Sequence, residues 1–112
     1  MSIKSFAARI FAKRIHATTQ KWAQNPVETQ QKVLESLILE AKNTIFGKDH
    51  FFSEIKNHAD FVKNVPIRDY EELKPYIDKV VAGEENILWK GKPLYFAKTS
   101  GTTSGAKYIP LT

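Results

Sequence analysis

Hydrophobic residues in the first part of the chain recur every three or four positions, which is the spacing of one face of an α-helix. Two successive segments, residues 1–24 and 25–47, each carry such a stripe. The stripes comprise Ile3, Phe6, Ala7, Ile10, Phe11 and Ile15, and then Val33, Leu34, Leu37, Ile38, Ala41 and Ile45. Asn25 is predicted to cap the second helix, Glu28 to complete a capping box, and Gly47 to end the helix.

Shorter helices are predicted in the middle of the chain. The apolar residues of 48–66 predict short helical pieces packed onto the core, which Pro66 would end. Residues 69–72, Asp-Tyr-Glu-Glu, repeat the pattern of a cap followed by glutamate and predict a helix start. Pro75 is expected to break or restart that helix, and Gly83 to end it.

The hydrophobic spacing changes after residue 86. Residues 87–89 are predicted to form a strand-like run, residues 90–93 a turn, and residues 94–97 a strand. A glycine-rich loop follows, and residues 108–111 are predicted to return as a second strand. The fold class is therefore a mainly α-helical segment of three to five helices followed by a β-hairpin-like region. The expected organisation is a basic amphipathic helix over 1–24, a helical region over 25–86 and a β region over 87–112.

The net charge of +5 lies entirely in residues 1–24, which hold five basic side chains and no acidic one. The other residues hold 12 basic and 12 acidic side chains. Three roles for this helix stay open: packing on its own protein, which we favour, contact with a membrane surface, and service as an organelle transit peptide. The cations are too few for a phosphate-binding stripe, so we expect no nucleic-acid partner. They are Lys4, Arg9, Lys13, Arg14 and Lys21.

The chain contains no cysteine, which excludes disulfides, thiolate metal sites and cysteine nucleophiles. A reducing compartment fits this composition, and we expect a cytoplasmic protein. No apolar run approaches the roughly 20 residues of a membrane span, so we expect no transmembrane segment. His16, His50 and His58 do not have the spacing of metal ligands, and we expect no protein metal site.

The segment from Thr99 to Lys107 has the composition of an anion-binding loop. Gly101 and Gly105 allow positive φ angles and a close approach of backbone N–H groups to an anion. Lys107 adds a positive charge that can offset negative charge developing in a reaction. Four hydroxyls can donate to phosphate oxygens, those of Ser100, Thr102, Thr103 and Ser104. The spacing is that of neither a Walker A loop nor a dinucleotide fingerprint, and the alternative is a hairpin or linker without a ligand.

Residues 96–110, Phe-Ala-Lys-Thr-Ser-Gly-Thr-Thr-Ser-Gly-Ala-Lys-Tyr-Ile-Pro, resemble the phosphate-loop signature of adenylate-forming enzymes. The segment is most similar to the GH3 auxin-responsive family of acyl-acid amido synthetases. In the wider superfamily, glycine often follows the Thr-Thr pair directly and proline precedes the lysine, whereas Ser104 and Ala106 stand at these places here. Further segments that resemble the GH3 family are residues 46–51, 65–71, 75–77, 83–84 and 88–89, so the resemblance covers about 30–112.

This resemblance implies an α/β fold for the full-length family and a two-step ligase. A carboxylic acid attacks the α-phosphate of ATP to give an acyl-adenylate and pyrophosphate. An amine, such as that of an amino acid, then attacks the acyl carbon to form an amide. The resemblance also implies that Mg²⁺ bridges the ATP phosphates and that Lys107 assists catalysis electrostatically. The residues that it implies for ATP binding are Ser100, Gly101, Thr102, Thr103, Ser104 and Gly105.

Members of this family run to several hundred residues. The resemblance therefore implies that the chain is an incomplete N-terminal part of the adenylate-forming large domain, inactive as a ligase by itself. The adenine and acyl pockets would then lie beyond Thr112. The alternative function is that of a small helical module whose basic N-terminal helix binds a membrane surface or a protein partner.

Overall fold

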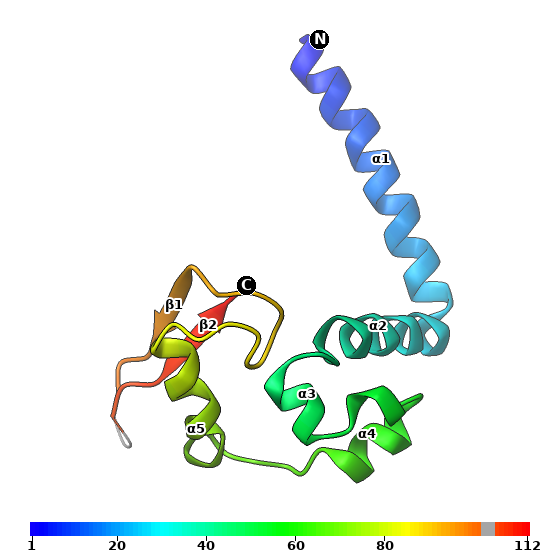
Figure 1. Cartoon of the computed structure of the whole chain (residues 1–112). Coiled ribbons are helices and arrows are strands. Elements are labelled where there is room, and N and C mark those ends of the chain that lie inside the picture. Colours follow the sequence, from blue (N-terminus) through cyan, green and yellow to red (C-terminus); the bar gives the residue numbers. More distant parts are fainter. Residues whose placement is uncertain (102–104) are drawn as a thin grey trace. The chain divides into compact units, whose positions relative to one another are not determined.

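The computed structural model describes residues 1–101 and 105–112. Its elements are α1 (Ile3–Gln24), α2 (Pro26–Ala41), α3 (Ile45–Asp49), the 3₁₀ helix η1 (Phe52–Glu54), α4 (His58–Asn64), α5 (Tyr70–Val81), β1 (Tyr95–Lys98) and β2 (Tyr108–Leu111) (Figure 1). This confirms the predicted helical region followed by a β-hairpin. The chain divides into two compact units, residues 1–33 and residues 34–112.

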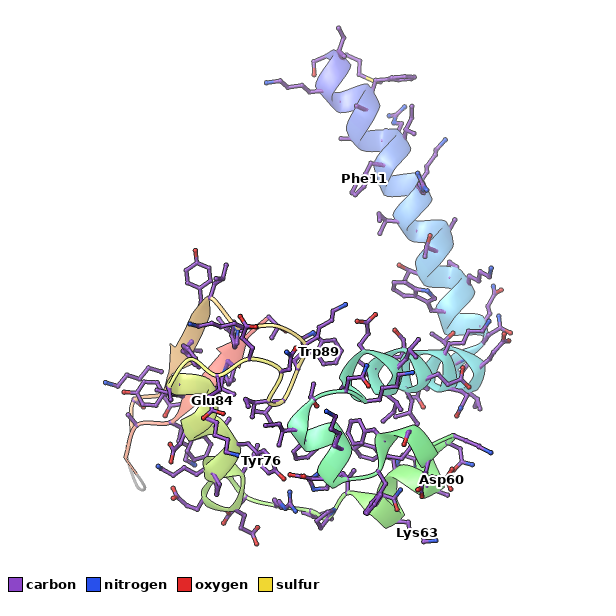
Figure 2. The ribbon with its side chains drawn as sticks, viewed as in Figure 1. Phe11, Asp60, Lys63, Tyr76, Glu84 and Trp89 are labelled. Atoms are coloured by element: carbon purple, nitrogen blue, oxygen red, sulfur yellow. The ribbon has the colours of Figure 1, made fainter. Side chains whose placement is uncertain are left out.

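The first unit contains α1, none of whose residues is buried. Its aromatic residue Phe11, labelled in Figure 2, is 66% exposed. Asn25 donates its side-chain amide to the Lys21 carbonyl at 3.2 Å, so this side chain completes the end of α1. Glu28 forms an ion pair with Lys32 at 2.6 Å. The predicted capping box at the start of α2 is therefore wrong, because the Asn25 N–H that Glu28 would accept from donates to the Trp22 carbonyl at 3.1 Å. Capping of α2 by the Asn25 side-chain oxygen stays a prediction.

The core of the second unit forms where the end of α2 meets η1. Buried side chains from these elements make one cluster, and partly buried side chains from α3, α4 and the segment before β1 pack around it. Trp89, labelled in Figure 2, is one of these surrounding residues. The buried members are Ile38, Ala41, Phe52 and Ile55, and Ile77, Val80 and Ile87 are buried elsewhere in the unit.

The prediction that Gly47 ends the second helix is wrong. Helix α2 ends at Ala41, and Gly47 lies inside the separate helix α3. The buried hydroxyl of Thr44 donates to the Ala41 carbonyl at 2.7 Å and accepts from the Gly47 N–H at 2.9 Å, which ends one helix and starts the next. A Cβ atom on Gly47 would collide with the Ala41 carbonyl oxygen. Glycine is needed here because two backbone segments approach each other closely.

The predicted start of α5 is confirmed as a reciprocal capping box. The Asp69 carboxylate accepts from the Glu72 N–H at 2.9 Å, and the Glu72 carboxylate accepts from the Asp69 N–H at 3.0 Å. Pro75 lies within the continuous helix, so the predicted break is wrong. The proline removes one backbone hydrogen bond. The capping box, the Lys74–Asp78 ion pair and the burial of Ile77 and Val80 stabilise the helix on both sides of it.

Residues 87–89 do not form the predicted strand. The carbonyls of Asn86 and Ile87 instead accept hydrogen bonds from the N–H groups of Ile45 and Phe46, at 2.9 and 3.0 Å. These bonds satisfy N–H groups at the start of α3, and the Ile87 side chain is only 2% exposed. The apolar run is thus explained by burial beside a helix rather than by pairing in a sheet.

The two predicted strands around the glycine-rich loop are confirmed. β1 and β2 pair antiparallel, with Tyr95 opposite Leu111 and Lys98 opposite Tyr108. Helix α5 contacts β2 (Figure 1). No helix among the described residues is both long and apolar enough to cross a membrane.

Candidate functional site

The loop between β1 and β2 is closed at its base by Thr99 and Lys107. The Thr99 N–H donates to the Lys107 carbonyl at 3.0 Å, and the Lys107 N–H donates to the Thr99 hydroxyl oxygen at 3.0 Å. The Thr99 hydroxyl oxygen thereby takes the place that a main-chain carbonyl oxygen has in a regular pair of antiparallel strands. These two bonds extend the hairpin by one pair beyond Lys98 and Tyr108 and define residues 100–106 as the loop.

The two glycines of the loop both have positive φ angles, +68° at Gly101 and +78° at Gly105. At Gly101 a Cβ atom would lie only 2.8 Å from the Ala106 nitrogen, whereas at Gly105 no described atom outside its chain neighbours would lie within 4 Å of a Cβ atom. The backbone at Gly101 therefore lies directly against the returning segment. Ser100 is exposed beside it. The candidate residues Thr102, Thr103 and Ser104 lie outside the described part of the chain.

Two lysines flank the loop. The Lys107 ammonium lies 5.5 Å from the centre of the Tyr70 ring, and the Lys98 ammonium lies 5.8 Å from the centre of the Tyr108 ring. Within residues 1–101 and 105–112, neither lysine forms an ion pair with a carboxylate. Their positive charges are thus not neutralised by a carboxylate of the described residues, which is favourable for an anion at the loop.

Sequence reasoning did not identify Lys98 and Tyr70 as parts of this site. Lys98 could have been found from the strand register, since it directly precedes the loop and lies opposite Tyr108. Tyr70 is 38 residues from Tyr108, and no local pattern indicates that its hydroxyl bonds to the Tyr108 main chain. Only the packing of α5 against β2 brings Tyr70 to the loop.

Tyr76 and His50 form a separate cluster with Asp49 and Phe46 of α3. The Tyr76 hydroxyl donates to the Asp49 carboxylate at 2.7 Å, and burial together with this bond raises the pKa of Tyr76 (Figure 2). The buried ring of His50 stacks on Phe46 and lies with Nδ1 2.7 Å from the Phe46 carbonyl oxygen. The described residues contain no group of three or more His, Asp or Glu side chains that could hold a metal ion.

Comparison with known proteins identifies similar sequences over most of the chain. The family model described as the GH3 family N-terminal domain matches residues 15–112. The indole-3-acetic acid-amido synthetase GH3.15 of Arabidopsis thaliana is 33% identical over 90 residues, which are 79% of this chain and 15% of that protein. The 4-substituted benzoates-glutamate ligase GH3.12 of the same plant is 35% identical over 88 residues, 74% of this chain and 14% of that protein.

A rice protein, the probable indole-3-acetic acid-amido synthetase GH3.13, is 39% identical over 56 residues, which are 48% of this chain and 12% of that protein. The chain thus spans about 15% of the length of the curated relatives that it matches. No solved structure matches it.

Proposed function

Because the chain belongs to the GH3 family, we propose that it supplies the ATP phosphate-binding loop of an ATP-dependent acyl-acid amido synthetase. In the first step, a carboxylate oxygen of the acid bonds to the α-phosphorus of ATP and pyrophosphate leaves. In the second step, the nitrogen of an amine or amino acid bonds to the acyl carbon, AMP leaves and an amide forms. The two substrates besides ATP are a small carboxylic acid and an amine.

The observation that carries this proposal is the closed loop between β1 and β2. Thr99 and Lys107 hold its base. Gly101 has a positive φ and no side chain, so no side-chain atom covers the backbone where it turns. Backbone N–H groups in such turns form concave sites for anions. The charge of Lys107 at the base, which pairs with no carboxylate in the part of the chain that the structure describes, adds attraction for phosphate. These features favour a loop that binds the triphosphate of ATP over a loop that only connects two strands.

The roles follow from the chemistry of each group. The hydroxyls of Ser100, Thr102, Thr103 and Ser104 would donate to phosphate oxygens, and the backbone at Gly101 and Gly105 would allow the phosphates to approach. Lys107 would offset the negative charge that develops as pyrophosphate leaves. Mg²⁺ would bridge the phosphates and neutralise part of their charge, with phosphate oxygens and water as its ligands.

The test is acid-dependent exchange of pyrophosphate into ATP by the complete protein, measured over a panel of carboxylic acids. We expect exchange that requires both Mg²⁺ and one class of acid. Replacing Thr102 and Thr103 with valine removes two donors to a charged ligand and should lower the exchange rate at least about tenfold.

The adjacent pair Thr18 and Thr19 in α1 provides a matched control, since their hydroxyls donate to backbone carbonyls within that helix. The double change to valine there should leave exchange unchanged. Exchange that is absent with every acid, or that survives the loop substitutions at the wild-type rate, would refute the assignment.

A second function, at α1, is favoured by a separate observation. Apolar side chains of α1 are exposed, including Ile3 at 88% and Phe11 at 66%, and the helix carries cations without a single acidic residue. An amphipathic basic helix of this kind has the chemistry to lie on an anionic membrane surface. This function concerns residues 1–24 and is compatible with ligase activity in the rest of the protein.

Co-sedimentation with vesicles of phosphatidylserine and phosphatidylcholine tests this second function. Changing Lys13 and Arg14 to glutamate should weaken binding by at least about tenfold, because each charge near an anionic surface contributes about 1 kcal/mol. The same reversal at the exposed residues Lys42 and Lys63 should have little effect. Absence of binding by the wild-type protein, or equal loss in both double variants, would contradict a role for α1.

A further inference from the structure

Tyr70, the first residue of α5, reaches across to the strand that follows the loop. Its hydroxyl accepts a hydrogen bond from the Tyr108 N–H at 2.9 Å and directs its own proton toward the Tyr108 carbonyl oxygen at 3.5 Å. Tyr108 is the first residue of β2 and follows Lys107 directly. The hydroxyl thus holds the backbone at the point where the chain leaves the loop.

The face of the Tyr70 ring contacts the Lys107 side chain, next to the backbone that the hydroxyl holds. The Lys107 ammonium lies 5.5 Å from the ring centre, within the range of a cation–π interaction. An aromatic face orients an ammonium group without neutralising it, whereas a carboxylate would form an ion pair and compete with an anionic ligand. Lys107 has no carboxylate partner among the described residues, so Tyr70 holds its side chain while its charge stays available.

Tyr70 is itself held on a rigid support. The reciprocal capping box between Asp69 and Glu72 fixes the turn of α5 that carries it. Ile77 and Val80 anchor the rest of that helix in the interior, each 4% exposed. The contact between Tyr70 and β2 therefore ties the end of the loop to the capped start of α5.

We infer that Tyr70 is a positioning residue for the phosphate-binding loop. Its hydroxyl sets the start of β2, and its ring sets the direction of the Lys107 side chain. This inference rests on the proposed function, because ATP phosphates are the ligand that the loop would hold. Tyr70 would act on ATP through the main chain and through Lys107, without touching ATP itself.

The experiment compares Tyr70→Phe with Tyr76→Phe in the complete protein. Tyr76 is a matched control because it lies on the same helix and its hydroxyl donates to Asp49 instead of to the hairpin. In Tyr70→Phe we expect the KM for ATP to rise about fivefold, the effect of one lost hydrogen bond of ordinary strength, with an unchanged KM for the carboxylic acid. A general loss of stability would not raise the KM for ATP while leaving the KM for the carboxylic acid unchanged.

A second variant separates the two contacts. Tyr70→Leu removes the ring as well as the hydroxyl, so kcat should fall in addition, because Lys107 would no longer be oriented toward the reacting phosphate. In Tyr76→Phe both KM values should equal those of the wild type. An unchanged KM for ATP in Tyr70→Phe, or an equal rise in Tyr76→Phe, would overturn the inference.

Hydrogen exchange followed by mass spectrometry provides a readout that does not require activity. Peptides that cover residues 106–112 should exchange faster in Tyr70→Phe than in the wild type, because the Tyr108 N–H loses its acceptor. Unchanged protection would overturn the positioning role by itself. If the wild-type protein shows no acid-dependent pyrophosphate exchange, the proposed function fails, and faster hydrogen exchange in Tyr70→Phe would then still establish that Tyr70 anchors the loop.

Discussion

Replacing Gly101 with alanine should lower kcat/KM for ATP in the complete protein by about a hundredfold or more. Gly101 has φ = +68°, where an L-residue costs about 1–2 kcal/mol. Its new Cβ would also lie 2.8 Å from the Ala106 nitrogen and the Gly105 carbonyl carbon. All of these neighbours are backbone atoms, so the loop must open. Overpacking of this kind typically costs a further 1–3 kcal/mol, and each 1.4 kcal/mol is about tenfold.

Alanine substitutions at two other glycines distinguish the effect of backbone strain at positive φ from the effect of a steric collision of the new Cβ. Gly105 has φ = +78° and Gly91 has φ = +76°, and within residues 1–101 and 105–112 neither would bring a new Cβ within 4 Å of an atom outside its chain neighbours. Gly105→Ala therefore adds strain within the loop and should lower kcat/KM for ATP about tenfold. Gly91→Ala adds similar strain outside the loop and should leave the kinetics for ATP unchanged. Activity of Gly101→Ala equal to that of Gly105→Ala would show that the close approach at Gly101 is not required.

Replacing Gly47 with alanine should destabilise the unit of residues 34–112 by about 3 kcal/mol or more, the upper end of the range for overpacking. The new Cβ would collide with the Ala41 carbonyl oxygen and lie 3.0 Å from the Ala41 carbonyl carbon and the Lys42 Cα. That carbonyl oxygen also accepts hydrogen bonds from the N–H and the hydroxyl of Thr44. The carbonyl cannot move aside without breaking the connection between α2 and α3.

Urea unfolding followed by far-UV circular dichroism measures this effect. Gly91→Ala is the control, and it should lower the free energy of unfolding by only about 1–2 kcal/mol, because it adds φ strain without a collision. A Gly47→Ala protein without a cooperative transition would agree with the prediction, since the loss would then exceed the total stability of the unit. A Gly47→Ala protein as stable as Gly91→Ala would contradict the tight backbone contact.

Local patterns predicted most of the secondary structure. The spacing of apolar residues located α1 and α2, the sequence Asp69 to Glu72 predicted a capping box that the structure confirms, and Gly83 does follow the end of α5 with φ = +93°. The strands on both sides of the loop were also predicted. These features depend on hydrogen bonds and side chains within a few residues of each other, which a single sequence contains.

The errors have a different cause, which is a contact that no local sequence pattern specifies. Residues 87–89 have the composition of a strand, but the carbonyls of Asn86 and Ile87 accept from N–H groups at the start of α3, about 40 residues earlier. Gly47 resembles a helix stop, but its role depends on the Ala41 carbonyl that packs against it. Pro75 normally breaks a helix, yet burial of Ile77 and Val80 together with the capping box keeps α5 continuous.

Some residues of the candidate site were predicted from the sequence, and others were found only in the structure. Composition and resemblance selected Ser100, Gly101, Gly105 and Lys107 together with the three residues between the glycines, and their binding of ATP stays a prediction. The strand register added Lys98, and packing of α5 on β2 added Tyr70. The loop and the two residues at its base can therefore be located from the sequence, whereas Tyr70, which contacts β2 from α5, cannot.

The sequence by itself determined the family, the positions of the main helices and strands, and the location of a glycine-rich loop between two strands. Each of these follows from short-range spacing, from the absence of a side chain at glycine, or from the order of residues in a motif. Only the tertiary structure decided that Gly47 contacts the Ala41 carbonyl, that the carbonyls of residues 86 and 87 bond to the start of α3, and that the Tyr70 ring lies beside the Lys107 ammonium. These depend on which surfaces meet when apolar side chains are buried, and burial brings together residues that no local pattern relates.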